Sequence, residues 1–343
     1  MQEDSYLNSH LVRYDNFVPC TTAFIDTRTP GSSEKENFTI IGPGVSENPD
    51  QFVHIARPHG FNVGGARQPP NCVNSQHSHE TAEVFFVLRG KWRFVSGENG
   101  EDGEVFLSPG DTISIPTRCF RGFENVGETE GFLFAVLGSD DPGRVTWAPY
   151  VFQKASKHGL VLLENGNLVD TAAGEELPKE VPVMPTTSSA DVQSMRRLDS
   201  KGLEDCVVKH DQRTYIESLL GPGILEAPLI GLGVLEGLQD QAKPSLSWAH
   251  GFQMSHLQLA PAAQSRPYAS DYPEVLVVQR GRVSVVIRDR TISLNVGDVL
   301  SLEVRVTRVV ANNSAQPAEI FSIRGGDSTT LDLQAEGSSC FDY

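Results

Sequence analysis

Short apolar runs separated by turn residues fill two long stretches of the chain. In residues 50–138 these runs are rich in β-branched and aromatic side chains and end at Gly, Pro, Asn or Asp. Such runs are typical of strands joined by tight turns. A second stretch of the same kind covers residues 248–325. Regularly spaced short strands favour a sandwich or barrel, so we expect an all-β protein with two such domains.

The segment between the two β stretches is more polar and has helix-like patterning in residues 190–205 and 213–223. We therefore expect a partly helical linker that packs against the barrels. The expected organisation is an N-terminal extension (1–49), a first barrel (50–150), the linking segment (151–247) and a second barrel (248–343).

The two β stretches align with each other, which indicates an internal duplication. The spacing from His59 to Glu83 is 24 residues, and so is the spacing from His250 to Glu274. Each stretch continues with Gly-Asp and then with Arg-x-x-Arg-x-x-x-Asn. Several matches in the same order favour a duplication over two unrelated β-domains that share turn residues.

Charge and composition narrow the class of function. The 343 residues are 39% hydrophobic and 21% charged, as in folded domains that bury their own cores. A formal net charge of −16 disfavours nucleic acid and anionic membranes as partners. We expect a small-molecule substrate, and a local basic pocket would allow this substrate to be an anion. We expect the protein to be a monomer or a homodimer.

The cysteines and the first residues bear on the cellular compartment. The five cysteines are scattered without a CxxC pair, so we expect reduced thiols. Residues 1–16 carry acids where a signal peptide needs a basic region, and no uninterrupted apolar run reaches membrane-spanning length. The expected location is the cytoplasm.

One motif in the first stretch carries candidate chemistry. His77-Ser78-His79 precedes Glu83 by a short bend, and Gly90 follows. Residues two apart on a strand point to the same face, so both histidines should enter one lumen, where Glu83 meets them from the same sheet. This pattern resembles the first motif of the cupin superfamily.

The downstream residues Gly110, Pro116 and Asn125 resemble the second cupin motif. The resemblance implies duplicated jelly-roll barrels (double-stranded β-helices), the first of which would hold a metal through His77, His79 and Glu83. Cupins host many reactions, so the resemblance indicates fold more strongly than function.

The chain departs from the family pattern in both halves. Arg121 stands where the family has its last histidine ligand, and a guanidinium has no free lone pair for a metal. In the second half Tyr268 and Ser270 replace the two histidines, while Glu274 is kept and Arg308 again takes the last place. We expect no transition metal in the second barrel.

Two interpretations of the first barrel stay open. A set of two histidines and one carboxylate suits Fe(II), with Mn, Ni, Co or Zn as alternatives, and Arg121 would then be a catalytic residue that holds a carboxylate or enolate of the substrate. Alternatively, Arg121 only neutralises Glu83 in a buried ion pair that recurs as Glu274 with Arg308.

The expected function is that of a mononuclear non-haem dioxygenase acting on a small oxygenated or aromatic compound, similar to the gentisate and quercetin bicupin dioxygenases. The gentisate type matches the motif poorly, and the quercetin type has the histidine that Arg121 replaces. The alternatives are an isomerase, decarboxylase or hydrolase in which the metal acts as a Lewis acid, and a metal-free small-molecule-binding cupin.

Other polar residues near the motif receive structural roles. His59 and Arg118 have counterparts in the barrel without histidines, so we expect a packing role for His59 and a turn for Arg118. Gln76 is one residue out of phase with His77. Five apolar residues should alternate into the lumen as core or substrate wall: Phe85, Val87, Trp92, Phe94 and Phe123.

Overall fold

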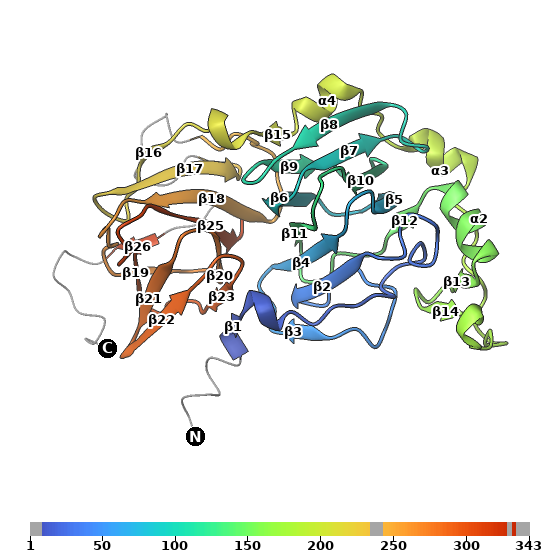
Figure 1. The fold of residues 1–343 in the computed structure, drawn as a ribbon, viewed down its shortest axis with the longest axis horizontal. Helices are drawn as coiled ribbons and strands as arrows, with labels where there is room; N and C mark the ends of the chain where they lie inside the picture. The colour runs from blue at the N-terminus through green and yellow to red at the C-terminus, as the bar shows by residue number, and fades with distance from the viewer. Residues whose placement is uncertain (1–8, 234–242, 328–330, 334–343) are drawn as a thin grey trace. The chain divides into compact units, whose positions relative to one another are not determined.

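A computed structural model describes residues 9–233, 243–327 and 331–333. The chain forms two compact units. The N-terminal unit comprises Val18–Ala56 and Asn62–His210, and the C-terminal unit comprises Met1–Phe17, Arg57–Phe61 and Asp211–Tyr343. Figure 1 shows that both consist mainly of strands. None of the helices in the described ranges has the length and apolarity needed to cross a bilayer.

The main body of the N-terminal unit is built from two large antiparallel sheets, apart from one parallel pair. In sheet order, the seven-stranded sheet contains β15 (Val207–Val208), β9 (Thr112–Ile115), β6 (Glu83–Arg89), β11 (Gly131–Gly138), β4 (Phe61–Gln68), β2 (Glu36–Ile41) and β3 (Val53–Ile55). The five-stranded sheet contains β12 (Thr146–Trp147), β5 (Val73–Ser78), β10 (Arg121–Asn125), β7 (Trp92–Ser96) and β8 (Gly103–Leu107).

The C-terminal unit repeats this arrangement. Its seven-stranded sheet runs β1 (Leu11–Val12), β23 (Val299–Leu302), β20 (Glu274–Arg280), β25 (Ala318–Gly325), β18 (Phe252–Leu259), β17 (Ile224–Ile230) and β16 (Ile216–Glu217). Its five-stranded sheet runs β22 (Arg290–Leu294), β21 (Val283–Ile287), β24 (Arg308–Ala311), β19 (Tyr268–Ser270) and β26 (Leu331–Leu333). The equivalent strands neighbour each other in the same order, so the all-β fold and the duplication are confirmed.

Alternation of side chains explains how each unit fills its core. In β21 the buried Val283, Val285 and Ile287 are two residues apart and share a cluster with Leu276 and Val278 of β20. Residues two apart on a strand point to one face, so apolar faces of both sheets meet. In the N-terminal unit the five expected apolar residues are all buried: Phe85, Val87, Trp92, Phe94 and Phe123.

Helical segments lie in the linking region, but not everywhere we expected them. Residues 190–205 hold two short helices, α3 (Ser189–Ser194) and α4 (Ser200–Glu204), whose N-termini are capped by the side chains of Ser188 and Asp199. The expected helix over 213–223 is wrong, because this stretch contains β16 instead. Gly221 and Gly223 adopt positive φ angles of 143° and 75°, and Pro222 between them also breaks a helix.

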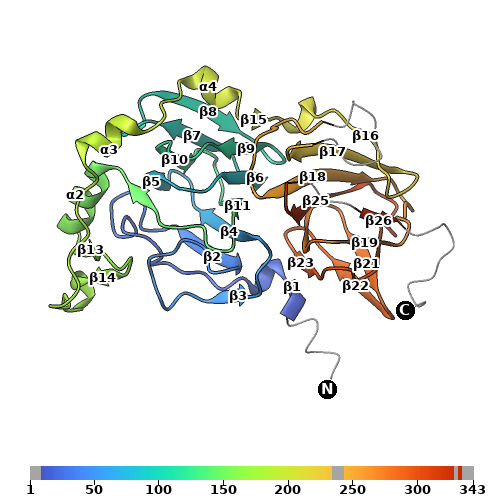
Figure 2. The ribbon, with the colours of Figure 1, turned by 180° about the vertical axis from the view of Figure 1, so that it is seen from behind.

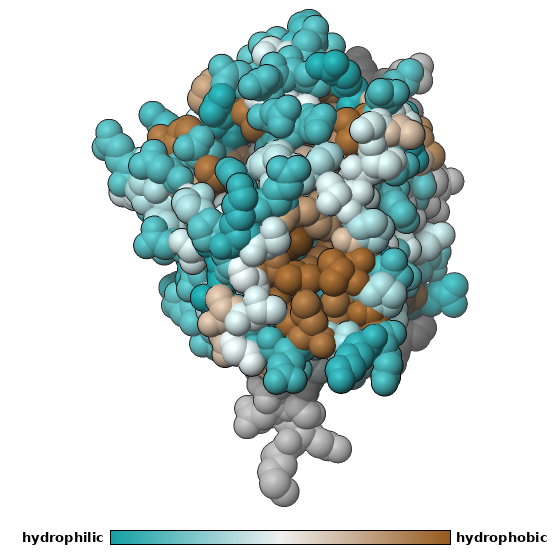
Figure 3. All heavy atoms as spheres, turned by 90° about the vertical axis from the view of Figure 1, so that its right-hand side faces the viewer, coloured by the Kyte–Doolittle hydropathy of each residue, from teal (hydrophilic) through white to brown (hydrophobic). Residues whose placement is uncertain are grey.

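A further helix was not expected from the sequence. Helix α2 (Pro149–Lys157) packs beside β13 (Leu160–Leu162), which pairs with β14 (Leu168–Asp170), as both ribbon views show (Figures 1 and 2). Its buried Val151 and Ala155 join Trp147 and Phe120 in an apolar cluster. Figure 3 views the side on which α2 lies and shows an apolar area framed by hydrophilic side chains.

The boundaries of the sheets differ from the expected ones. The region 1–49, expected as an extension, supplies β1 to the C-terminal unit and β2 to the N-terminal unit. The linking region supplies β15, which pairs with β9, and β17, which pairs with β18. Short strands that cover the edges of β23 and β9 protect backbone groups that would otherwise remain unpaired.

These two edge strands begin similar segments, Leu-Val-Arg-Tyr-Asp-Asn from residue 11 and Val-Val-Lys-His-Asp-Gln from residue 207. In the C-terminal unit, the Tyr14 amide donates to Asp298 at 3.0 Å. In the N-terminal unit, the His210 amide donates to Asp111 at 2.8 Å. The duplication therefore includes an edge-covering segment that lies far along the chain from the strands it covers.

Candidate metal centre

The candidate ligands come from two sheets of the N-terminal unit. His77 lies near the end of β5, His79 follows that strand, and Glu83 begins β6. Because β5 belongs to the five-stranded sheet and β6 to the seven-stranded one, Glu83 does not come from the same sheet as His77, and that detail of the prediction is wrong. The chain crosses between the sheets at residues 79–82, which brings the three side chains together.

The three side chains form a compact buried group. One ligand atom from each of His77, His79 and Glu83 lies within 4.8 Å of the other two. His79 Nε2 is 3.7 Å from Glu83 Oε2, and the two imidazole rings are 5.1 Å apart at 81°. All three residues are at most 5% exposed. Two atoms that share an ion at about 2.0–2.3 Å are at most about 4.6 Å apart, so small side-chain adjustments would bring the group around one metal.

Neighbouring polar groups orient His77. Its Nδ1 is 2.8 Å from the Ser75 carbonyl, which assigns the proton to Nδ1 and leaves Nε2 as the ligand atom. The Asn74 amide lies beside the same Nδ1 and accepts a hydrogen bond from Lys35 at 2.9 Å. Lys35 also forms a fully buried ion pair with Asp26. An extended buried network thus fixes the ring.

Arg121 joins this group from β10, where it pairs in register with His77. Its guanidinium forms an ion pair with Glu83 and donates to the His77 carbonyl at 3.2 Å, while its Nε has no partner in the described part of the chain. The ion pair occupies Glu83 Oε2. Among the described residues, no hydrogen bond is made to Glu83 Oε1, so this oxygen is left for a ligand.

Burial controls the protonation of the group. Burial, with Arg121 second, holds the pKa values of His77 and His79 well below 6.5. Both rings are therefore neutral, the form that ligates a metal. Burial also raises the pKa of Glu83, and Arg121 offsets only part of that rise.

The donor set fits one divalent ion. Two neutral imidazoles and a carboxylate with a free oxygen suit Mn, Fe, Co, Ni or Zn. The Nδ1 of His79 is buried and has no hydrogen-bond partner among the described residues. Buried polar atoms usually have a partner, so this nitrogen indicates a site that is completed by a bound ligand or ion. The nearby guanidinium repels a cation, so affinity should be lower than in a site with a fourth neutral ligand.

The equivalent position in the C-terminal unit is arranged differently. Tyr268 pairs in register with Arg308, as His77 does with Arg121. The Tyr268 hydroxyl donates to Glu274 at 3.0 Å, and Arg308 binds the same oxygen at 2.8 and 3.0 Å. Arg324 and Ser322 occupy the other oxygen at 2.9 and 2.6 Å. Both Glu274 oxygens are thus engaged by protein groups.

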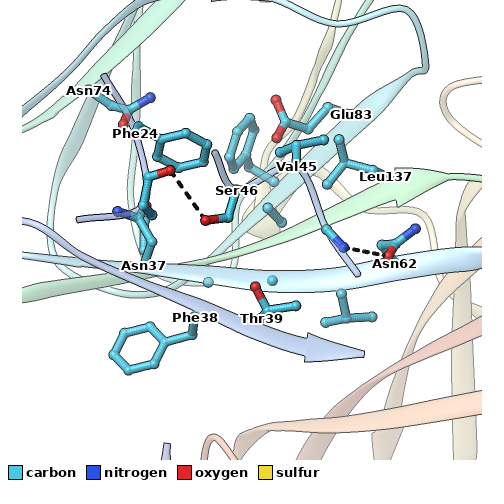
Figure 4. A pocket seen from close by; sticks show the side chains of 18 of the residues that line it. Phe24, Asn37, Phe38, Thr39, Val45, Ser46, Asn62, Asn74, Glu83 and Leu137 are labelled. Atoms are coloured by element: carbon cyan, nitrogen blue, oxygen red, sulfur yellow. Dashed lines mark hydrogen bonds between the residues drawn. The ribbon is translucent and has the colours of Figure 1, made fainter. Parts of the chain in front are cut away.

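A pocket in the N-terminal unit reaches the candidate ligands (Figure 4). His77, His79 and Glu83 line one part of it. The segment Gly44–Ser46 runs along another part, anchored by a hydrogen bond from the Gly44 amide to Asn62 at 2.9 Å and by one from the Ser46 hydroxyl to the Ala23 carbonyl at 3.2 Å. The ligands therefore face a hollow that a small molecule can enter.

The residues assigned structural roles lie outside this group. His59 hydrogen-bonds the Arg57 carbonyl and the Ser301 hydroxyl within the C-terminal unit. Arg118 has a φ of 57°, and its counterpart Arg305 has one of 58°, so both occupy left-handed turn positions. The Gln76 amide points away from the pocket and donates to the carbonyls of Val95 and Gly97.

Sequence reasoning missed several residues around the site. Phe24 and Val45 line the pocket from outside the expected barrel, and the Trp147 ring lies 5.3 Å from that of His77. No motif marks these positions. Asn74, three residues before His77, is out of phase with it in a regular strand, but the register of β5 against β10 shifts between the two residues and both line the pocket. Asn74 could have been found only from its hydrogen bonds.

Comparison with known proteins supports the family. Residues 66–137 match the family model described as "Cupin domain". Germin-like protein subfamily 1 member 4 of Arabidopsis thaliana is 34% identical over 125 residues, 33% of this chain and 54% of that protein. Member 5 is 33% identical over 144 residues, 39% of this chain and 62% of that protein. The chain thus spans little more than half the length of these two relatives.

Solved structures extend the likeness to nearly the whole chain. The oxalate decarboxylase of Lactobacillus farciminis, solved as a formate complex, matches with a TM-score of 0.55 and 11% identity over 94% of this chain and 88% of that one. The Bacillus subtilis oxalate decarboxylase at pH 4.6 matches with a TM-score of 0.54 and 12% identity over 94% and 78%. At these identities the likeness shows the fold alone. The chain therefore has a cupin domain at residues 66–137 and, over nearly its whole length, the two-barrel fold of a bicupin.

Proposed function

We propose that this bicupin is a metal-dependent enzyme that acts on a small carboxylate by non-oxidative chemistry, with decarboxylation as the favoured reaction. The carrying observation is the buried group of His77, His79 and Glu83, whose ligand atoms lie within 4.8 Å of one another at a pocket. Arg121 places a cation beside this group. The arginine cation and the three metal-ligand side chains together suit a substrate that is bound through a carboxylate.

A bound divalent metal would act as a Lewis acid that polarises a substrate oxygen. His77 and His79 would hold it as neutral donors, and Glu83 would supply its free oxygen. Arg121 would hold Glu83 in place through their ion pair and add positive charge next to the bound carboxylate. The apolar pocket walls would exclude water, which strengthens each of these charge interactions.

The choice of non-oxidative chemistry rests on two points. The structures with the same two-barrel fold reported above are decarboxylases of a small carboxylate. In addition, Arg121 is buried, and its ion pair with Glu83 gives the site a fixed cation of the kind that stabilises developing negative charge. The dioxygenase function and the preference for Fe(II) stay predictions, as does the metal-free binding cupin.

Metal-loaded protein should be assayed for CO2 release and O2 uptake with a panel of carboxylates. We expect turnover that releases CO2 without net O2 consumption, that needs a divalent metal, and that is lost in His77→Ala. Oxygen uptake in proportion to product would replace this proposal with the dioxygenase. A protein that binds carboxylates but retains no metal after reconstitution would be a binding cupin.

A further inference from the structure

The walls of the pocket are mostly apolar. Besides the three candidate ligands, the side chains that line it are predominantly aromatic or aliphatic, and they come from the loops before and after β2 as well as from both sheets: Phe24, Phe38, Val45, Val63, Phe85, Phe123 and Leu137. Figure 4 shows Val45 and Leu137 near Glu83, and Phe24 near Ser46. A ligand held at the donor group would place the rest of its body against these side chains.

Most polar side chains of the pocket wall already form hydrogen bonds with other groups of the protein. Thr39 donates to Gln51 at 2.6 Å, and the Gln51 amide donates to the Pro43 carbonyl. The Asn62 side chain bridges the Gly44 amide and the Ser139 carbonyl. Ser46 and Asn74 are likewise engaged, which leaves Asn37 as the wall residue whose side-chain amide has no partner among the described residues. The wall thus offers few hydrogen bonds to a ligand.

Positive charge is confined to the donor end. No lysine or arginine is among the described residues that line the pocket. Arg121 lies behind Glu83, and Lys35 is paired with Asp26 in the buried network. A second carboxylate on the ligand, directed away from the metal, would lie against apolar groups without a counter-ion, which is costly.

We propose that this pocket selects a monocarboxylate with an apolar body, aromatic or branched aliphatic, over a dicarboxylate. The inference rests on the proposed function, because the carboxylate is placed at the metal held by His77, His79 and Glu83. It goes further by assigning specificity to the wall formed by Phe24, Val45 and Leu137. Apolar pockets with a few convergent polar groups bind ligands of this character.

The probes are acetate, phenylacetate and succinate, titrated calorimetrically into Mn(II)-loaded protein with the metal content measured before and after. Phenylacetate adds an apolar ring to acetate, whereas succinate adds a second carboxylate. We expect phenylacetate to bind at least about tenfold more tightly than either, because its ring is removed from water. Succinate binding as tightly as phenylacetate, or phenylacetate no tighter than acetate, would overturn the inference.

The same series on metal-free protein separates this inference from the proposed function. If the protein retains no metal, the proposed function fails, yet the wall is unchanged and phenylacetate should still bind more tightly than succinate. If metal binds and succinate is preferred, the proposed function stands and the inference fails.

A shape-conserving variant assigns the effect to the wall. Val45→Thr replaces a methyl group by a hydroxyl, so phenylacetate affinity should fall about threefold or more while acetate affinity stays the same. Val18→Thr is the matched control, since Val18 is 43% exposed and lies outside the pocket lining of the same unit. Equal effects of the two variants, or none in Val45→Thr, would contradict the assignment to Val45.

Discussion

The two barrels keep the same glutamate and use it differently. Glu83 and Glu274 each begin the equivalent strand of the seven-stranded sheet, and each is bound by an arginine from the equivalent strand of the five-stranded sheet. Glu83 keeps one oxygen free and has two neutral histidines beside it. Glu274 has both oxygens engaged and a tyrosine in the place of His77. One is a candidate ligand, and the other is the centre of a buried ion cluster.

The difference between the two glutamates comes from one further strand in each barrel, β11 and its equivalent β25. Leu137 of β11 lies opposite Glu83 in register, and Arg324 of β25 lies opposite Glu274. Two residues earlier along these strands, Ala135 corresponds to Ser322. Leu137 and Ala135 line the pocket, whereas Arg324 and Ser322 bind Glu274. A few side chains on a common fold thus decide between an open site and a closed one.

The largest expected effect comes from removing the charge at the centre of the ion cluster. Glu274→Gln removes the carboxylate that Arg308 and Arg324, both buried, share as their ion-pair partner. The free energy of unfolding should fall by about 3–5 kcal/mol in urea titrations. Glu303→Gln, at a half-exposed ion pair with Arg57, is the control and should cost at most about 1 kcal/mol. A loss below about 1 kcal/mol in Glu274→Gln would show that the cluster is not held by this charge.

Acid should weaken the C-terminal barrel through the same residue. Burial alone would raise the pKa of Glu274, but Arg324 and Arg308 lower it from 4.5 to about 2. A lowered pKa contributes stability that is complete above about pH 4.5 and is lost as the pH falls towards 2, in total about 3 kcal/mol. Hydrogen exchange in β20, corrected for the intrinsic rate, should report this loss, and Glu274→Gln should remove it. Unchanged acid dependence in the variant would contradict the assignment.

Grafting the closed arrangement onto the open barrel tests the comparison directly. In the C-terminal barrel, Arg324 and Ser322 engage the second oxygen of Glu274. The double variant Leu137→Arg with Ala135→Ser places the same two side chains beside Glu83, where they should occupy Oε1. Metal affinity should drop about 100-fold, which is about 2.7 kcal/mol, in calorimetric titrations with Mn(II). Leu137→Met keeps the volume and should leave affinity nearly unchanged. Undiminished binding in the double variant, with the fold intact by circular dichroism, would show that Oε1 is not a ligand.

The smallest effect concerns the arginine that both barrels share. Arg121→His removes the cation next to the donors and adds a possible fourth ligand, so metal affinity should rise about tenfold or more. Arg308→His is the matched control, because Tyr268 and Ser270 stand in the places of His77 and His79 and this position should gain no metal affinity. Weaker binding in Arg121→His would mean that Arg121 supports the ligands rather than opposing the metal.

The features that could be predicted from the sequence are those marked by a local pattern of residues. The alternation of apolar residues and the two cupin-like motifs predicted the duplicated barrels, and the ligand spacing brought His77, His79 and Glu83 together. The lining residues Phe24 and Val45 escaped prediction, because they lie in irregular segments on either side of β2, whose approach to the motif depends on the long-range pairing of β2 with β4. The roles of Arg324 and Leu137 were also invisible, since both read as ordinary strand residues until their register was known.

The expected sheet boundaries were inaccurate for a related reason. Strands of two residues, such as β1 and β15, carry no periodicity to recognise. They form because a longer strand offers a free edge, and because Asp298 and Asp111 cap the segments that follow. Such pairing depends on contacts across about 90 to 290 positions of sequence, which a local pattern does not encode.

The central claim is that His77, His79 and Glu83 of the N-terminal barrel hold a metal, and the most direct test is the metal stoichiometry of three proteins. Chelator-stripped wild type, His77→Ala and Tyr268→Phe should be reconstituted with Mn(II), desalted and analysed by plasma mass spectrometry, with folding checked by circular dichroism. We predict about one ion per chain in the wild type and in Tyr268→Phe, and none in His77→Ala. No ion in the wild type, or one ion retained in folded His77→Ala, would contradict the account.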